Sequence, residues 1–264
     1  MTVDPFRQFM AITCFEMRRV MISWRMLFAF VCMVIICGFS FNAGNLDSSG
    51  KSGIQACYAM LRPFLASAPM MIAICAAVLA SESLSEEFER RTGYIIFTRS
   101  LDRSVLFIGK YMSRLIPAVA ILFLYYAVVF GICYAEVGEL PGEVFNVLPV
   151  ALLYLLAVIG ICMLISSLSP RGSIALAVSF ILLVVLPLLI DNVIFVTEPW
   201  YSLAYESRVL GDLLTNQTIF SMDGVGNIIT SDYVPDVRIA SSVMAVYAIL
   251  STLFAASFFR YRSM

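Results

Sequence analysis

Histidine is absent from this sequence of 264 residues, and charged residues make up only 13% of it. Histidine is the commonest general base and the commonest metal ligand in proteins. Its absence excludes Ser-His-Asp and Cys-His catalysis, and it excludes metal binding through imidazole. We therefore predict that the chain is not an enzyme and has no catalytic, cofactor-binding or metal-binding residues.

A basic excess is also missing, since the formal net charge is -1. Nucleic-acid binding depends on a basic surface that displaces counterions from phosphates, so we assign no nucleic-acid partner. The seven cysteines show no CxxC spacing, and most lie in apolar stretches where cysteine behaves as a small hydrophobic residue. Only Cys57 and Cys133 are placed to reach an outer face together, and the sequence leaves open whether they pair. The sequon at Asn216 likewise leaves glycosylation open.

Apolar residues are abundant instead: 61% of the sequence is hydrophobic and its mean hydropathy is +0.93. Soluble domains contain about 45–50% apolar residues, so this composition indicates a chain that folds in a lipid bilayer. Six windows of 19 to 27 residues lack Asp, Glu, Lys and Arg, and each is long enough to cross the hydrocarbon core. From them we predict six transmembrane helices, at about residues 26–46, 63–81, 115–135, 145–168, 174–196 and 239–259.

Residues 4–25 predict a helix that precedes the first span. Asp4 and Pro5 are typical of a helix start, and the apolar residues that follow recur at helical spacing. Arginines along this helix favour a position on the inner leaflet. A signal peptide would have a shorter charged start and small residues at a cleavage site, so we expect the segment to be retained.

Basic residues predict the orientation of the bundle. Six crossings place both termini on one side, and 13 of the 17 lysines and arginines then fall on that side. The positive-inside rule therefore predicts a multi-pass protein of the cell membrane with cytoplasmic N- and C-termini. The 82–114 segment carries eleven charged residues between two uncharged spans, and we predict that it lies in water on the same side.

The 82–114 segment has an internal order that a generic charged loop would not need. Leu84 and Phe88 stand four residues apart on a short predicted helix, with acidic residues early and basic residues late. Gly93 favours the end of that helix, and the residues after Ser100 predict a second helix that rises into the third span. The sequence therefore predicts a polar hairpin with one apolar stripe.

Two further patterns leave alternatives open. Ala73, Ala77 and Ser81 repeat at four-residue spacing, which allows close helix packing either within one chain or between two copies. In the outer segment 197–238, leucines from Leu203 onward indicate a short helix. The Asp223-Gly224 pair indicates either a small hairpin or an irregular lid.

The polar hairpin resembles that of a known family. SEEFERRTGY at 85–94, a short apolar run, and SLDRSVLFIGKYMSRL at 100–115 are similar to the cytoplasmic coupling segment of ABC-2 type permease subunits in prokaryotic ABC transporters. The similarity is greatest to the group linked in name to maturation of multicopper enzymes. The N-terminal helix carrying Glu16 and Arg18, the six spans and the position of the hairpin are also similar. Ser100 departs from the proline that the family often has before the turn.

The resemblance implies a single ABC-2 type transmembrane domain over residues 1–264 that binds no cofactor itself. It implies a dimer, formed with a second copy or with a different permease, surrounded by lipid. It also implies that a separate ABC ATPase subunit binds ATP and Mg and drives the permease through the hairpin. The residues that it assigns to ATPase coupling are Leu84, Glu86, Glu87, Phe88, Glu89, Arg90, Arg91, Thr92, Gly93 and Arg103. In this hypothesis Leu84 and Phe88 dock in the ATPase as apolar anchors, and the charged residues around them set orientation.

We therefore expect an all-α membrane protein with six transmembrane helices and an N-terminal interfacial helix. A cytoplasmic coupling hairpin lies between spans two and three, and a larger outer segment lies between spans five and six. The expected function is that of the membrane-spanning permease subunit of an ABC exporter. The alternative is a mechanical transmitter of the same fold that moves an extracytoplasmic partner and carries no substrate. An intramembrane enzyme is disfavoured because no pair of buried carboxylates is available.

Overall fold

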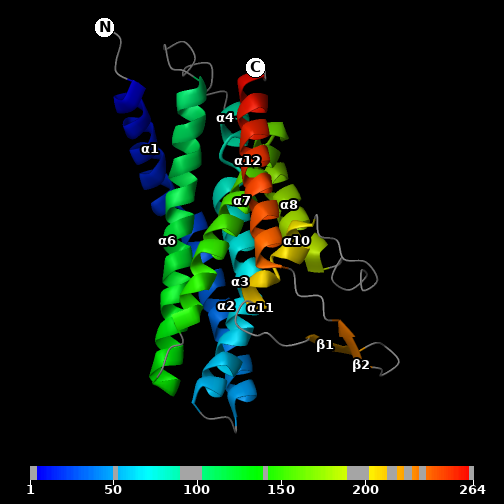
Figure 1. The fold of residues 1–264 in the computed structure, drawn as a ribbon. Coiled ribbons are helices and arrows are strands. Elements are labelled where there is room, and N and C mark those ends of the chain that lie inside the picture. The colour runs from blue at the N-terminus through cyan, green and yellow to red at the C-terminus, as the bar shows by residue number, and fades with distance from the viewer. Residues whose placement is uncertain are drawn as a thin grey trace.

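The structure, a computed structural model, describes residues 5–49, 53–89, 103–138, 142–188, 202–212, 219–222, 228–231 and 236–261. These ranges form a bundle of helices with one small pair of strands at its side (Figure 1). The helices are α1 (Pro5–Met21), α2 (Trp24–Ser48), α3 (Ile54–Ala80), α4 (Ser85–Glu89), α6 (Arg103–Val137), α7 (Val147–Leu168), α8 (Gly172–Phe180), α10 (Leu203–Glu206), α11 (Val209–Asp212) and α12 (Val237–Tyr261). A 3-10 turn, η1 (Gly142–Asn146), precedes α7, and a π-helical turn, η2 (Ile181–Val185), continues α8.

Five helices in the described part of the chain are long and apolar enough to cross a membrane, namely α2, α3, α6, α7 and α12. The spans predicted at 26–46, 145–168 and 239–259 agree with α2, α7 and α12 to within two residues at each end. The span predicted at 174–196 overlaps a shorter apolar helix, Gly172–Leu188, and its last residues lie outside the described ranges. The layout of six spans therefore stays a prediction.

Two helices are much longer than the spans predicted for them. α3 begins at Ile54, nine residues before the predicted span, and continues through Pro63 and Pro69. A proline removes only one backbone donor, which a membrane helix tolerates because its neighbours compensate. α6 begins at Arg103, twelve residues before the predicted span, and so includes the helix that the residues after Ser100 predicted. Its charged residues Lys110 and Arg114 have ion-pair partners within the protein.

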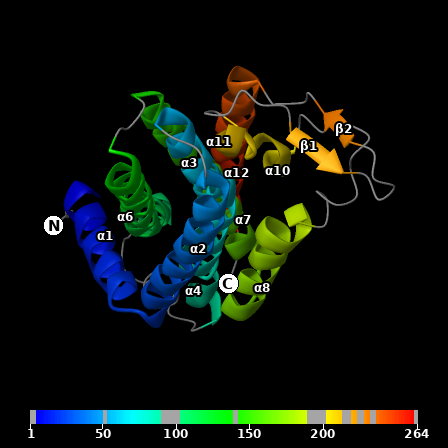
Figure 2. The same ribbon diagram turned by 90° about the horizontal axis from the view of Figure 1, so that it is seen from below.

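α3 lies at the centre of the bundle and packs against α2, α6 and α7 (Figure 2). Every residue from Met71 to Ala80 is buried. Ala73, Ala77 and Ser81 are at most 1% exposed, so their small-residue face packs within the chain. α7 and α12 also pack closely, because a Cβ atom at Gly160 would lie only 2.1 Å from Ser251 Oγ.

α1 is the helix predicted before the first span, and it packs along α6. A Cβ atom at Gly109 would lie 2.9 Å from Ile12 Cγ2, so a glycine permits this close approach. Thr13 and Glu16 are buried, whereas Phe15 and Met21 are exposed. The buried face of α1 therefore combines polar residues with Val20, and its exposed face combines arginines such as Arg18 with apolar residues.

The described part of the outer segment contains α10, α11 and the strands β1 (Ile219–Met222) and β2 (Ile228–Ser231). The strands pair antiparallel, with Ile219 opposite Ser231. Of the two alternatives that the sequence left open, these paired strands correspond to the small hairpin, although Asp223 and Gly224 lie outside the described ranges. The chain is therefore not strictly all-α. α11 returns to the bundle and packs against α3, where Gly211 lies beside Ala66.

Candidate functional site at the charged end of the bundle

The candidate site lies at the end of the bundle where α1 begins, α12 ends and α3 leads into α4 (Figure 1). We call it the charged end, because the five ion pairs found among the described side chains lie there. We call residues 82–89, which comprise the end of the turn after α3 and all of α4, the connector.

α7 holds the start of the connector through one serine. Ser166 Oγ accepts hydrogen bonds from the backbone N–H groups of Leu84 and Ser85, at 2.9 and 3.1 Å. The first N–H groups of a helix have no partner within that helix. Ser166 thus supplies from another helix what an N-cap residue supplies locally. Since Ser166 and Leu84 are both 0% exposed, this contact fixes α4 to α7 inside the protein.

Four charged side chains from α1, the connector and α6 are buried together. Glu16, Glu87, Lys110 and Arg114 are each less than 10% exposed. Lys110 Nζ lies 2.7 Å from Glu87 Oε1 and 3.7 Å from Glu16 Oε1. Arg114 Nη2 lies 3.4 Å from Glu16 Oε2. Two carboxylates thus face two cations, and a buried ion is tolerated only when it is paired in this way.

The two cations of α6 also hold the connector through Ser83. Lys110 Nζ donates a hydrogen bond to the Ser83 carbonyl oxygen at 3.2 Å, and Arg114 Nε donates one to Ser83 Oγ at 3.3 Å. Lys110 and Arg114 are four residues apart, so they lie on the same face of α6. One helix face therefore binds both the backbone and the side chains of the connector.

Three more contacts attach the outer side of the connector to α1, α2 and α8. Arg19 Nη2 lies 2.5 Å from Glu86 Oε1, and Arg25 is paired with Glu82. The backbone N–H of Gly172 donates to Glu89 Oε2 at 3.0 Å, which places a carboxylate at the positive end of the α8 dipole. More than a third of the Arg19 side chain is exposed, so its pair is screened and positions the connector more than it stabilises the fold.

An open cavity of about 290 Å³ lies between the connector, α2 and α8. It is lined by Arg25, Glu82, Glu86, Glu89, Gly172 and Ser173.

Taken together, the eight residues of the connector contact α1, α2, α6, α7 and α8. Figure 2 shows α1 and α8 on opposite sides of the bundle, so the contacts of the connector extend across it.

The structure corrects the predicted role of Leu84. This side chain is 0% exposed and belongs to the hydrophobic core, so it anchors the connector inside the protein and offers no surface to a partner. Glu86 and Glu87 are not free charges at a rim either, because both are engaged in ion pairs. Lys110 and Arg114 were predicted to lie in water and are buried, since the protein supplies carboxylates for them.

Of the other predicted coupling residues, the structure describes the side chain of Glu89 alone. Glu89 is exposed and also contacts α8. The side chains of Phe88 and Arg103, and all of Arg90, Arg91, Thr92 and Gly93, lie outside what the structure describes. Their role in coupling stays a prediction.

Sequence reasoning missed Ser166 and Gly172, which bind the connector, and Glu16, which pairs with the two cations of α6. One signal pointed to Glu16, because it is the only acidic residue between Asp4 and Asp47. Its partners on α6 are more than 90 residues away in sequence, so no local pattern identifies them.

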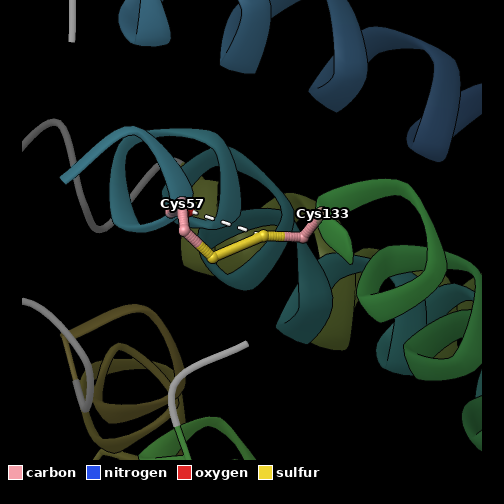
Figure 3. The surroundings of a disulfide bond; sticks show 2 residues. All are labelled: Cys57 and Cys133. Carbon is pink, nitrogen blue, oxygen red and sulfur yellow. Dashed lines mark hydrogen bonds between the residues drawn. A yellow bond between two sulfur atoms is a disulfide. The ribbon is translucent and has the colours of Figure 1, made fainter. Parts of the chain in front are cut away.

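Cys57 on α3 and Cys133 on α6 are joined by a disulfide (Figure 3). Their Cα atoms are 6.1 Å apart, and the bond closes a sequence separation of 76 residues. This answers the question that the sequence left open. The bond lies near the start of α3 and the end of α6, so it links these helices far from the charged end.

Among the described residues, no group of three or more Cys, Asp or Glu side chains is placed to hold a metal ion. The carboxylates of the connector are engaged with arginine, lysine or backbone N–H groups. What the arrangement provides is a rigid attachment of one short segment to several helices.

These features define a multi-pass helical membrane protein in which one charged connector joins five helices. The sequence matches the profile of a family described as ABC-2 family transporter protein over residues 10–261. The chain therefore belongs to the ABC-2 transporter family and is a permease subunit of an ABC transporter. A comparison with curated proteins found no match. The family match does not extend to the narrower resemblance to permeases linked to multicopper-enzyme maturation.

Proposed function

We propose that the chain is the permease subunit of an ABC exporter, driven through the connector by a separate ATPase subunit that binds ATP and Mg. The observation that carries this proposal is the set of contacts made by residues 82–89 to five helices. A partner that displaces the connector acts on all five helices at once. Membership of the ABC-2 family supports an ABC ATPase as that partner.

The proposed ATPase-binding surface consists of Phe88 and Glu89 at the end of α4 and of residues that follow α4. Phe88, Arg90, Arg91, Thr92, Gly93 and Arg103 supply its apolar and charged contacts. Leu84, Glu86 and Glu87 act from the other side, where they hold the connector to the bundle. The surface that receives the force and the residues that pass it on are therefore different members of the same segment.

The location of the nucleotide site tests whether ATP is bound by a separate subunit. The tagged chain is purified from its native membrane and photolabelled with 8-azido-ATP. We expect a separate subunit to copurify and to carry the label, while this chain stays unlabelled. Labelling of this chain, or ATP hydrolysis by this chain without a second polypeptide, would contradict the proposal.

We place the charged end in the cytoplasm. The distribution of lysine and arginine supports this orientation, with 13 of 17 on the proposed inner side. The disulfide far from the charged end also supports it, because disulfides persist in oxidising compartments outside the cytoplasm. A membrane-impermeant maleimide should label Ser49→Cys and Thr218→Cys in intact cells, and Thr92→Cys only after the cells are opened. Labelling of Thr92→Cys in intact cells would contradict this topology.

The assembly is proposed to contain two permease copies in lipid. Large apolar side chains are exposed along α2 and α12, such as Phe39 and Phe254, and they are suited to contact with lipid or with a second copy. The mass of the complex in nanodiscs should correspond to two copies of this chain with its ATPase subunits. One copy beside a different permease would indicate a heterodimer, and one copy alone would contradict the dimer.

Export and mechanical transmission predict different solute distributions. A strain whose ATPase subunit cannot hydrolyse ATP is compared with its parent by profiling small molecules in cells and medium. Export predicts a solute that accumulates in the cells and is depleted from the medium. No change in any solute, together with loss of an activity outside the membrane, would favour the mechanical alternative.

A further inference from the structure

We propose that Glu16 is a second counterion for Lys110, and that it receives the lysine when the connector moves away from α6. This inference rests on the proposed function, in which the ATPase subunit displaces the connector. It assigns a positioning role to α1, a helix that lies outside the predicted coupling segment. It also explains how a buried lysine tolerates the movement of its closest partner.

The distances show that Lys110 lies between two carboxylates on different elements. Its Nζ atom is 2.7 Å from Glu87 Oε1 on the connector and 3.7 Å from Glu16 Oε1 on α1. The first distance is that of a direct charge-assisted hydrogen bond, whereas the second is only an ion pair. Lys110 is 1% exposed, so in this arrangement protein groups and not water surround its charge.

Movement of the connector removes several contacts of the α6 cations together. Lys110 would lose Glu87 Oε1 and the Ser83 carbonyl oxygen, and Arg114 would lose Ser83 Oγ. Without another carboxylate, two cations would be left buried and unpaired, which is strongly unfavourable. Glu16 prevents this, because among the described residues it is paired with both cations and does not belong to the connector.

Close packing of α1 on α6 keeps Glu16 in reach. Gly109 directly precedes Lys110, and a Cβ atom there would lie 2.9 Å from Ile12 Cγ2 and 3.5 Å from Thr13 Oγ1. α1 therefore approaches α6 beside the lysine itself. The two oxygens of Glu16 face different cations, with Oε1 toward Lys110 and Oε2 toward Arg114. One carboxylate thus serves both cations without leaving α1.

A double-mutant cycle in thermal stability tests this exchange and needs no ATPase subunit. The full chain is reconstituted in nanodiscs as Glu16→Gln, Glu87→Gln and the double variant. If each carboxylate substitutes for the other, each single variant keeps a partner for Lys110 and the double variant does not. We expect the midpoint of the double variant to fall about 3 °C or more beyond the sum of the two single losses. Additive losses would overturn the proposal.

A matched control separates this coupling from a general effect of neutralising glutamate. Glu136 is exposed at the other end of α6. Glu136→Gln combined with Glu87→Gln should therefore give additive losses. Should Glu16→Gln fail to yield folded protein, the same cycle is run with Glu16→Asp. Aspartate retains the charge but is one methylene shorter, so we expect coupling that is weaker than with glutamine but still above the control pair. Coupling no greater than that of the control pair would overturn the proposal.

ATP turnover by the complex with the ATPase subunit tests the positioning role. We expect Glu16→Gln to retain the ATPase subunit and the KM for ATP but to lower kcat at least fivefold, with partial recovery in Glu16→Asp. Unchanged kcat would show that Glu16 has no part in coupling. If the stability cycle shows exchange while no ATPase subunit is found, the proposed function fails and the counterion exchange stands.

Discussion

Lys110 Nζ lies 2.7 Å from Glu87 Oε1, with 1% of the lysine side chain and 11% of the glutamate side chain exposed. The pair joins α6 to the connector within the protein. Because a buried pair is most costly when only one partner is removed, Lys110→Met should lower the free energy of unfolding by about 3–5 kcal/mol. Chemical unfolding in nanodiscs measures this, with the exposed Arg62→Met as control. A loss as small as that of the control would contradict the assignment of a buried ion-paired cluster.

Two glycines provide a matched test of the packing between α7 and α12. At Gly160 a Cβ atom would lie 2.1 Å from Ser251 Oγ and 3.2 Å from Thr252 Cγ2, whereas at Gly131 on α6 nothing lies within 4 Å. Gly160→Ala should therefore destabilise the protein by about 1–3 kcal/mol through overpacking. Gly131→Ala should stabilise it by roughly 0.5–1 kcal/mol, since alanine is the better helix former. Equal effects in thermal unfolding would contradict the close crossing of α7 and α12.

Glu206 on α10 should make stability depend on pH. It is 1% exposed, its Oε2 has no hydrogen-bond partner among the described residues, and burial raises its pKa above the ordinary value of 4.5. As the pH rises above that value, the unfolded chain loses the proton while the folded chain retains it, so stability falls. The fall ends when the pH passes the raised pKa of the folded state.

The variant Glu206→Gln removes this dependence. Its unfolding midpoint, measured in nanodiscs from acid to neutral pH, should rise relative to wild type as the pH increases. Glu136→Gln, an exposed site, should leave the difference constant. A wild-type protein that gains stability over the variant with rising pH would show that the Glu206 carboxylate is stabilised as an anion.

The parts of the fold that follow from local composition could be predicted from the sequence. The ends of α2, α7 and α12 agree with their apolar windows because hydropathy and helix length are local properties. The start of α6 at Arg103 agrees with the helix predicted after Ser100, whereas the start of α3 at Ile54 was not predicted. The charge-free window of α3 begins only after Arg62, although a charged residue does not end a helix.

The location of the site was also visible in the sequence, whereas its geometry was not. The charge pattern identified the 82–114 segment, since no other stretch between two spans is as polar. The geometry depends on contacts between residues that are far apart in sequence. The backbone of Leu84 bonds Ser166 at a sequence separation of 82, and Arg114 pairs with Glu16 at a separation of 98. For the same reason Leu84 resembled a surface anchor in the local pattern and is a core residue in the fold.

The central claim is that an ATPase subunit engages the chain at the end of α4, and Phe88→Ala tests it most directly. Recovery of the ATPase subunit with the tagged chain is measured together with ATP turnover and the amount of folded chain. Phe15→Ala, at an exposed aromatic residue on α1, is the control. An apolar interface anchor is worth roughly 2 kcal/mol or more, so Phe88→Ala should leave the chain abundant while reducing ATPase recovery and turnover. Normal recovery and turnover with a stable Phe88→Ala chain would contradict the claim.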